Sequence, residues 1–124
     1  MNTAVIAIVA GLFFLLTFLS GFWLSRTGRP LHAGLSTAHK LISLAAGIFL
    51  LVTIYQRNRV VPLSGTDWTV IVVTGLCFLG TVASGGLLST DKPAPVALLR
   101  VHQVVPVLTL ISSAAMLYLL LSAA

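Results

Sequence analysis

The chain has 124 residues, of which 58% are hydrophobic and 7% are charged, whereas a soluble domain carries about 25% charged residues. This composition excludes an ordinary soluble domain and indicates an integral membrane protein whose main partner is the lipid bilayer. The formal net charge is +5, but the cations are scattered at the ends of apolar runs and therefore do not indicate a nucleic-acid partner.

Long apolar runs predict four transmembrane helices. A bilayer core needs about 20 mostly apolar residues per helix. The second run becomes long enough when it is extended back over His39 and Lys40, because a lysine side chain can reach the headgroups from inside a span. The start of the chain lacks the basic segment of a signal peptide, so we expect the first helix to be retained. The expected helices cover about residues 3–25, 31–56, 67–89 and 94–122.

Three short links separate these helices, and each mixes turn-forming and charged residues. Links this short make neighbouring helices antiparallel, which predicts an all-α, up-down-up-down four-helix bundle that forms a single transmembrane domain over residues 1–124. Pro30 and Pro93 suit the first turns of the second and fourth helices, and Thr66 is expected to cap the third. The links are Arg26–Pro30, Arg57–Asp67 and Ser89–Pro93.

The distribution of Lys and Arg predicts the orientation of the chain. Five cations lie near the first and third links, and two lie at the second. Because cytoplasmic loops carry an excess of positive charge, we expect both termini outside, in a bacterial inner membrane. The five are Arg26, Arg29, Lys40, Lys92 and Arg100, and the two are Arg57 and Arg59.

Two histidines lie at matching places in the second and fourth helices. His39 follows Pro30 by nine residues and His102 follows Pro93 by nine, which places each imidazole about 13 Å along its helix. Ionisable side chains inside a span indicate a functional site. The second and fourth helices are diagonal in such a bundle, about 14 Å apart, so a flat cofactor fits between the imidazoles. We therefore predict that His39 and His102 are the axial ligands of one haem b.

Small and cationic residues near these histidines complete the predicted site. Small side chains let a porphyrin approach the helices, and a hydroxyl near a ligating imidazole can accept its second ring N–H. Cations can pair with haem propionates. Helix packing accounts for the same small residues and membrane topology for the same cations, and both alternatives stay open. The predicted cofactor-binding residues beside the histidines are Gly21, Ser36, Lys40, Ser43, Gly80, Ser84 and Arg100.

The histidine-bearing stretches Leu35–Leu41 and Leu99–Pro106 resemble the ligand-bearing helices of small bis-histidine cytochromes b. The resemblance covers only the second and fourth helices. It implies a four-helix membrane fold, a haem b held by His39 and His102, and electron transport. Many such proteins hold two haems, one near each membrane face, whereas this sequence has no histidine near the link that begins at Arg57. One haem is therefore expected.

The preferred function is that of a membrane electron-transfer protein that exchanges electrons with a quinone or a redox protein, as an electron carrier or oxidoreductase subunit rather than a stand-alone enzyme. One alternative is a histidine metal or quinone site without haem, since three histidines are present. Another is a tetraspan scaffold or transporter subunit with no cofactor, although proton-coupled transport usually needs an intramembrane carboxylate and both aspartates lie at links. The sequence leaves homo-oligomer formation open.

Overall fold

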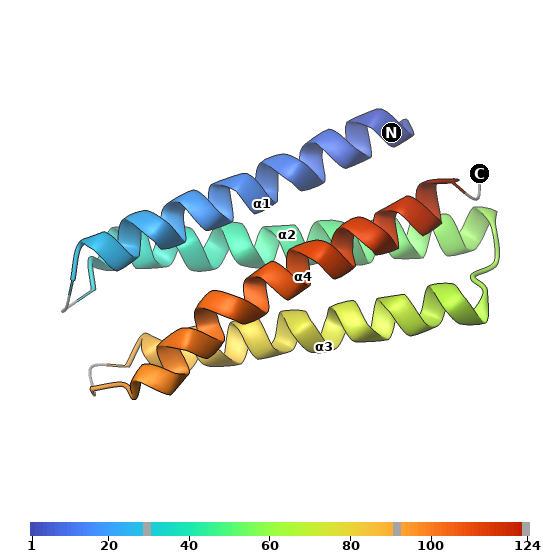
Figure 1. Cartoon of the computed structure of the whole chain (residues 1–124). Helices are drawn as coiled ribbons and strands as arrows, with labels where there is room; N and C mark the ends of the chain where they lie inside the picture. The colour runs from blue at the N-terminus through green and yellow to red at the C-terminus, as the bar shows by residue number, and fades with distance from the viewer. Residues whose placement is uncertain (29–30, 91–92, 123–124) are drawn as a thin grey trace. The chain divides into compact units, whose positions relative to one another are not determined.

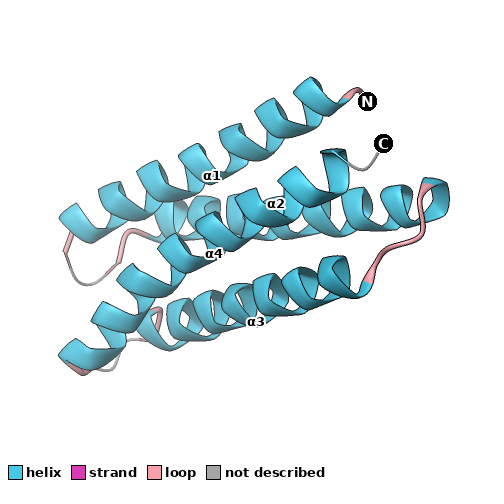
Figure 2. Ribbon diagram, turned by 45° about the vertical axis from the view of Figure 1, so that its right-hand side comes forward, coloured by secondary structure: helices cyan, strands magenta, loops and turns pink. Residues whose placement is uncertain are grey.

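The computed structural model describes residues 1–28, 31–90 and 93–122, and over these residues it is all-α (Figures 1 and 2). It contains four helices, each long and apolar enough to cross a membrane. This confirms the prediction of an all-α chain with four such helices. The helices are α1 (Thr3–Arg26), α2 (Ala33–Val60), α3 (Gly65–Leu88) and α4 (Val96–Ser122).

The chain folds into two compact units, Met1–Gln56 and Arg57–Ala124. The first is a helical hairpin made of α1 and most of α2. The second contains the last turn of α2 followed by a hairpin of α3 and α4. Each hairpin is antiparallel, as the helix course in Figure 1 shows.

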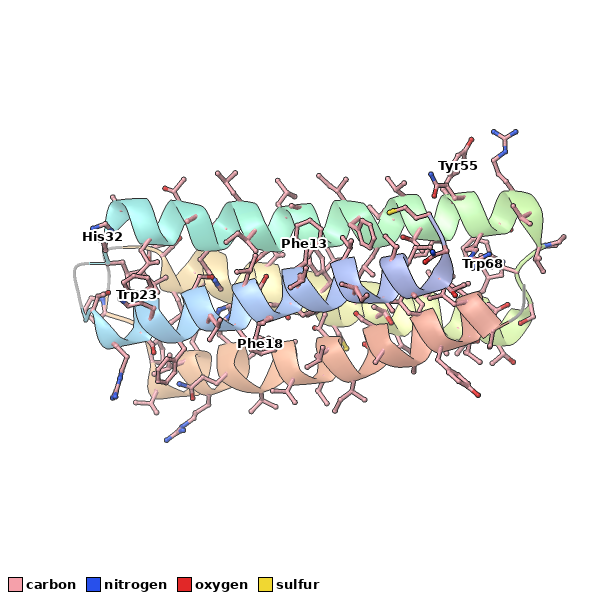
Figure 3. The ribbon with its side chains drawn as sticks, turned by 90° about the horizontal axis from the view of Figure 1, so that it is seen from above. Phe13, Phe18, Trp23, His32, Tyr55 and Trp68 are labelled. Carbon is pink, nitrogen blue, oxygen red and sulfur yellow. The ribbon has the colours of Figure 1, made fainter. Side chains whose placement is uncertain are left out.

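Aromatic side chains lie in the middle and towards both ends of the first hairpin. The rings of Phe13 on α1 and Phe49 on α2 are in contact, with centroids 5.7 Å apart. Figure 3 shows Trp23 and His32 towards the loop end of this hairpin and Tyr55 near the opposite end of α2. Aromatic residues with polar edges are enriched at membrane interfaces, so both ends of this hairpin suit a headgroup environment.

Local hydrogen bonds set the ends of α1. The side chain of Asn2 accepts a hydrogen bond from the backbone N–H of Val5 at 2.8 Å, as an N-cap residue does. The helix ends at Arg26, whose positive charge is favourable near the negative end of the helix dipole. Gly28 then adopts a left-handed conformation with φ +71°, which a residue with a side chain rarely adopts. The chain therefore turns immediately after α1.

A reciprocal cap starts α3, and it corrects the prediction that Thr66 is the N-cap. Ser64 is the cap: its hydroxyl accepts from the backbone N–H of Asp67 at 3.1 Å, and the Asp67 carboxylate accepts from the backbone N–H of Ser64 at 2.8 Å. Each side chain thus satisfies one backbone donor at the start of the helix. Thr66 cannot compete, because it already lies inside the first turn.

Two other predicted helix ends are also corrected. Pro93 lies before α4, which begins only at Val96, because Pro95 disfavours a helical backbone at the residue that precedes it. The carbonyl of Pro95 instead accepts the N–H of Leu98 at 3.1 Å. Helix α2 continues past residue 56 to Val60, and its last turn contains Arg57 and Arg59. Positively charged side chains are favourable there, because the C-terminal end of a helix carries partial negative charge. The prediction for Pro30 lies outside the described residues.

Candidate functional site

In the first hairpin, the imidazole of His39 lies against α1. His39 is in the seventh position of α2, which begins at Ala33, and its side chain is half-buried. Its Nδ1 is 3.0 Å from the hydroxyl oxygen of Ser20. Ser20 is itself buried, with 9% of its surface exposed. One nitrogen of the imidazole is therefore held by a buried hydroxyl on the neighbouring helix.

The bonding of Ser20 favours one tautomer of His39. The Ser20 hydroxyl also lies 3.0 Å from the backbone carbonyl of Thr17 and donates its single proton to it. A hydroxyl that has used its proton can act towards Nδ1 only as an acceptor. The neutral imidazole then carries its proton on Nδ1 and its lone pair on Nε2. This is the arrangement that fixes ring orientation in metal-ligating histidines.

Gly21 makes the close approach of His39 possible. A Cβ atom built at this position would lie 2.9 Å from Cε1 of the imidazole, closer than real Cβ atoms come to a neighbour. Any larger residue at position 21 would thus displace the ring or push α1 away. The glycine lets the two helices bring the imidazole and the Ser20 hydroxyl together.

The second hairpin repeats this arrangement around His102, which is in the seventh position of α4. Its Nδ1 is 2.9 Å from the hydroxyl oxygen of Ser84, which donates to the carbonyl of Thr81 at 3.0 Å. Ser84 is 4% exposed. A Cβ atom at Gly85 would lie 2.9 Å from Cε1 of His102. The same tautomer, with the lone pair on Nε2, is therefore favoured for His102.

A sequence repeat underlies the two equivalent arrangements. Residues 11–25 and 75–89 align without a gap, and nine of the fifteen pairs are identical. The identical pairs include the Thr, Ser and Gly of each arrangement. Ser20 and Gly85 were missed as site residues by reasoning from single helices, and this repeat was the signal that could have found them. The nine pairs are Gly11/Gly75, Leu12/Leu76, Phe14/Phe78, Leu15/Leu79, Thr17/Thr81, Ser20/Ser84, Gly21/Gly85, Leu24/Leu88 and Ser25/Ser89.

Two of the predicted small residues contact a histidine ring, Gly21 in the first hairpin and Ser84 in the second. Ser43 instead donates its hydroxyl to the backbone carbonyl of His39 at 2.8 Å, so it reaches the main chain and not the ring. A Cβ atom at Gly80 would be 3.5 Å from a methyl group of Val105, which makes Gly80 a packing position.

The remaining predicted residues do not touch the imidazole rings through any described contact. Ser36 is a buried residue of α2. Lys40 and Arg100 are exposed, and the guanidinium of Arg100 lies 3.4 Å from the side-chain oxygen of Gln103. The equal depth of the two histidines and the role of these cations stay predictions.

The third histidine has a local structural role. The Nδ1 of His32 accepts the backbone N–H of Leu35 at 3.0 Å, and its carbonyl accepts the N–H of Ser36 at 2.8 Å. His32 therefore caps the first turn of α2. Within residues 1–28, 31–90 and 93–122, no three His, Cys, Asp or Glu side chains gather in a group that could hold a metal ion.

Comparisons with protein-family models, with curated proteins and with solved structures find no match to this chain. In each hairpin, one imidazole lies within 3.0 Å of a buried serine hydroxyl on the facing helix, and the glycine that follows this serine lies against the same ring.

We expect Ser20→Ala and Ser84→Ala to weaken the preference of the adjacent histidine for the tautomer that carries its proton on Nδ1. Loss of a hydrogen bond worth about 0.5–1.5 kcal/mol should shift the ratio of the two neutral tautomers by roughly two- to thirteenfold. The measurement is nitrogen NMR of ¹⁵N-histidine-labelled protein. Ser25→Ala and Ser89→Ala are matched controls, because these hydroxyls donate to the local backbone carbonyls of Phe22 and Gly86. An unchanged ratio in the Ser20 and Ser84 variants would contradict the assignment.

Proposed function

We propose that this chain is an integral membrane electron-transfer protein that binds one haem b, with His39 and His102 as the two axial ligands. The observation that carries the proposal is the repeated arrangement of each imidazole. In both hairpins Nδ1 lies within 3.0 Å of a buried serine hydroxyl, so the lone pair of Nε2 is the one suited to iron. Two such ligands occupy both axial positions of a haem.

The proposed topology is an up-down-up-down bundle that crosses the membrane four times. Each helix has the length and composition of a span, and large apolar side chains on all four are exposed, including Leu19, Leu51, Leu79 and Ile111. In water such surfaces promote association, whereas lipid accommodates them.

Equal depth of the two imidazoles follows from this topology. If α2 and α3 each cross once, the α1–α2 and α3–α4 links lie on the same membrane side. His39 and His102 are each six residues beyond the first residue of their helix, about 9 Å along its axis. The two histidines are then at one level, as a shared haem requires.

The chain would supply position and electrostatics, and a bound haem would supply the one-electron chemistry. Ser20 and Ser84 orient the ligands and increase their basicity by accepting the Nδ1 protons. Gly21 and Gly85 leave the space that the rings need. The exposed cations Lys40 and Arg100 are suited to the propionates or to an anionic partner surface. The proposed electron partner is a quinone or a redox protein.

The proposed orientation has both termini outside, with the histidine side facing the cytoplasm of a bacterial inner membrane. It is supported by five cations near the links on the histidine side, against two near the other link. Membrane-impermeant labelling of an amino-terminal tag in whole cells should succeed. Labelling only after the cells are broken would reverse the assignment.

Purified full-length protein in detergent tests the cofactor. We expect a Soret band, and sharp visible bands of six-coordinate haem that appear on reduction with dithionite. Pigment extraction should give one haem b per chain. A colourless protein that holds zinc or copper would favour a histidine metal site, and a colourless protein without metal would favour a scaffold subunit. Either result would overturn the haem proposal.

A further inference from the structure

Three buried positions of the second hairpin carry hydroxyl groups where the first hairpin is apolar. Thr74 on α3 and Thr109 and Ser113 on α4 are 5%, 2% and 1% exposed. Extending the sequence repeat by one residue, and aligning His39 with His102, gives their counterparts in the first hairpin. These counterparts are Ala10, Ala46 and Leu50, which are also buried. The same three positions are therefore interior in both hairpins, and only the second hairpin places polar groups there.

The register of the second hairpin places Ser113 and Thr74 at neighbouring levels. The hydroxyl oxygens of Thr81 and Thr109 are 3.1 Å apart, so these two residues face each other. Ser113 follows Thr109 by four residues on α4, and Thr74 precedes Thr81 by seven on α3. Both spacings keep a residue on the same helix face. Because the two helices are antiparallel, Ser113 and Thr74 lie on the same side of the facing pair, about 6 Å and about 10 Å from it along the axis.

The hydroxyl oxygen of Ser113 is buried and has no hydrogen-bond partner among the residues that the structure describes. Its neighbours on α4 are bonded: Ser112 donates to the carbonyl of Thr109 at 3.2 Å, and Thr109 donates to the carbonyl of Val105 at 3.0 Å. Helical hydroxyls commonly make such bonds. Because an unpaired hydroxyl in the interior is costly, the Ser113 hydroxyl indicates a ligand that bonds to it.

The bonding of Thr74 shows what the ligand must do. Thr74 donates its hydroxyl proton to the carbonyl of Val70 at 2.8 Å, which leaves the oxygen able to accept. Ser113 still has a proton to donate. The ligand therefore accepts one hydrogen bond and donates another across a difference in level of about 4 to 5 Å. Water has both capacities, and two bonds of about 2.8 Å each span that interval.

Smaller side chains accompany the hydroxyl groups at this level of the second hairpin. In the first hairpin the rings of Phe13 and Phe49 are in contact, with centroids 5.7 Å apart. The equivalent residues of the second hairpin are Cys77 and Ser112, which have no rings. Cys77 is four residues before Thr81, the same step along the hairpin that separates Ser113 from its facing pair. A polar interior with less side-chain volume is the environment that buried water requires.

We propose that the α3–α4 hairpin contains an internal hydration site at Ser113. A water molecule accepts the proton of the Ser113 hydroxyl and donates to the hydroxyl oxygen of Thr74 on the facing helix. Thr109, one turn from Ser113 on the same face, provides a further acceptor for this water or a neighbouring one. The second hairpin is then hydrated inside its span, and the first is dry at the equivalent level. The site lies within one hairpin and does not depend on the proposed haem.

Water-edited solid-state NMR of the full-length protein in lipid bilayers, with ¹³C-labelled serine and threonine, tests this site. Magnetisation should pass from water to Ser113 and Thr74 several-fold faster than to Thr53, a buried threonine of the first hairpin that donates to the carbonyl of Phe49 at 2.9 Å. Ser113→Leu, which copies the first hairpin, should reduce the transfer at Thr74 to that of Thr53. Ser112→Ala is the matched control and should leave the transfer at Thr74 unchanged.

The stability of Ser113→Ala gives a second readout with a definite sign. Loss of the bond to water should lower the ratio of folded to unfolded protein about two- to thirteenfold, measured by denaturant titration in mixed micelles. A hydroxyl without a bound water would give the opposite sign, because its removal relieves a buried polar group. If Ser113→Leu does not fold, Thr74→Ala replaces it and should slow the transfer to Ser113. Transfer to Ser113 and Thr74 no faster than to Thr53, or a Ser113→Ala protein more stable than wild type, would overturn the inference.

Discussion

Replacing either His39 or His102 by alanine is expected to abolish the spectrum of six-coordinate haem. Each variant loses one of two iron ligands and leaves the serine hydroxyl at 3.0 Å or 2.9 Å without its imidazole partner. One remaining ligand should give a five-coordinate, high-spin haem with affinity lowered by at least about tenfold. The double variant should purify without haem. Absorption spectra of membranes and of purified protein provide the measurement.

His32→Ala is the matched control for these substitutions. His32 uses Nδ1 to accept a backbone N–H at the start of α2, so its loss should cost about 0.5–2 kcal/mol of helix stability and leave the haem spectrum unchanged. If His39→Ala or His102→Ala keeps the wild-type spectrum, that histidine is not a ligand. Loss of haem in His32→Ala alone would direct attention to a different site.

Gly21→Ala and Gly85→Ala are expected to reduce haem occupancy without destabilising the fold. The added Cβ would lie 2.9 Å from Cε1 of the adjacent imidazole, so the ring must turn away from its serine. Only the end of one side chain has to move, and alanine favours a helix over glycine by about 0.5–1 kcal/mol. We expect haem affinity to fall about 10- to 100-fold while the thermal unfolding temperature of haem-free protein is maintained or raised.

Gly11→Ala and Gly75→Ala are controls from the same repeat. A Cβ atom at either position would meet nothing within 4 Å, so both variants should bind haem as wild type does. Haem titration of the four variants, with unfolding followed by circular dichroism, separates the two effects. Full haem occupancy in Gly21→Ala and Gly85→Ala would show that close helix approach is not required.

Hydropathy was sufficient to place the four helices, because each contains an apolar run of about the 20 residues that a membrane-spanning helix needs. The helix ends were less predictable. At α3, either Ser64 or Thr66 could cap by residue type, and only the reciprocal bonds with Asp67 distinguish them. At α4, the second proline of a Pro-Ala-Pro segment delays the helix, an effect that reasoning from Pro93 alone does not capture.

The histidines could be found from the sequence because ionisable groups inside a span are costly, but their hydrogen-bond partners could not be chosen. Serines on the same helix as His39 looked suitable, yet Ser43 donates to a backbone carbonyl one turn earlier, as helical serines commonly do. The partner comes from the neighbouring helix instead, and identifying Ser20 requires the inter-helix register. Comparison of the two halves of the sequence supplies that register, since Ser20 and Ser84 occupy equivalent positions.

Electron paramagnetic resonance of oxidised, full-length protein tests the shared haem most directly, because the ferric signal reports which atoms occupy both axial positions. We predict one low-spin signal typical of two imidazole ligands, with an intensity of one spin per chain, that becomes high-spin in His102→Ala and in His39→Ala. A high-spin signal in the wild type, or haem whose signal does not respond to either substitution, would contradict ligation by these two histidines.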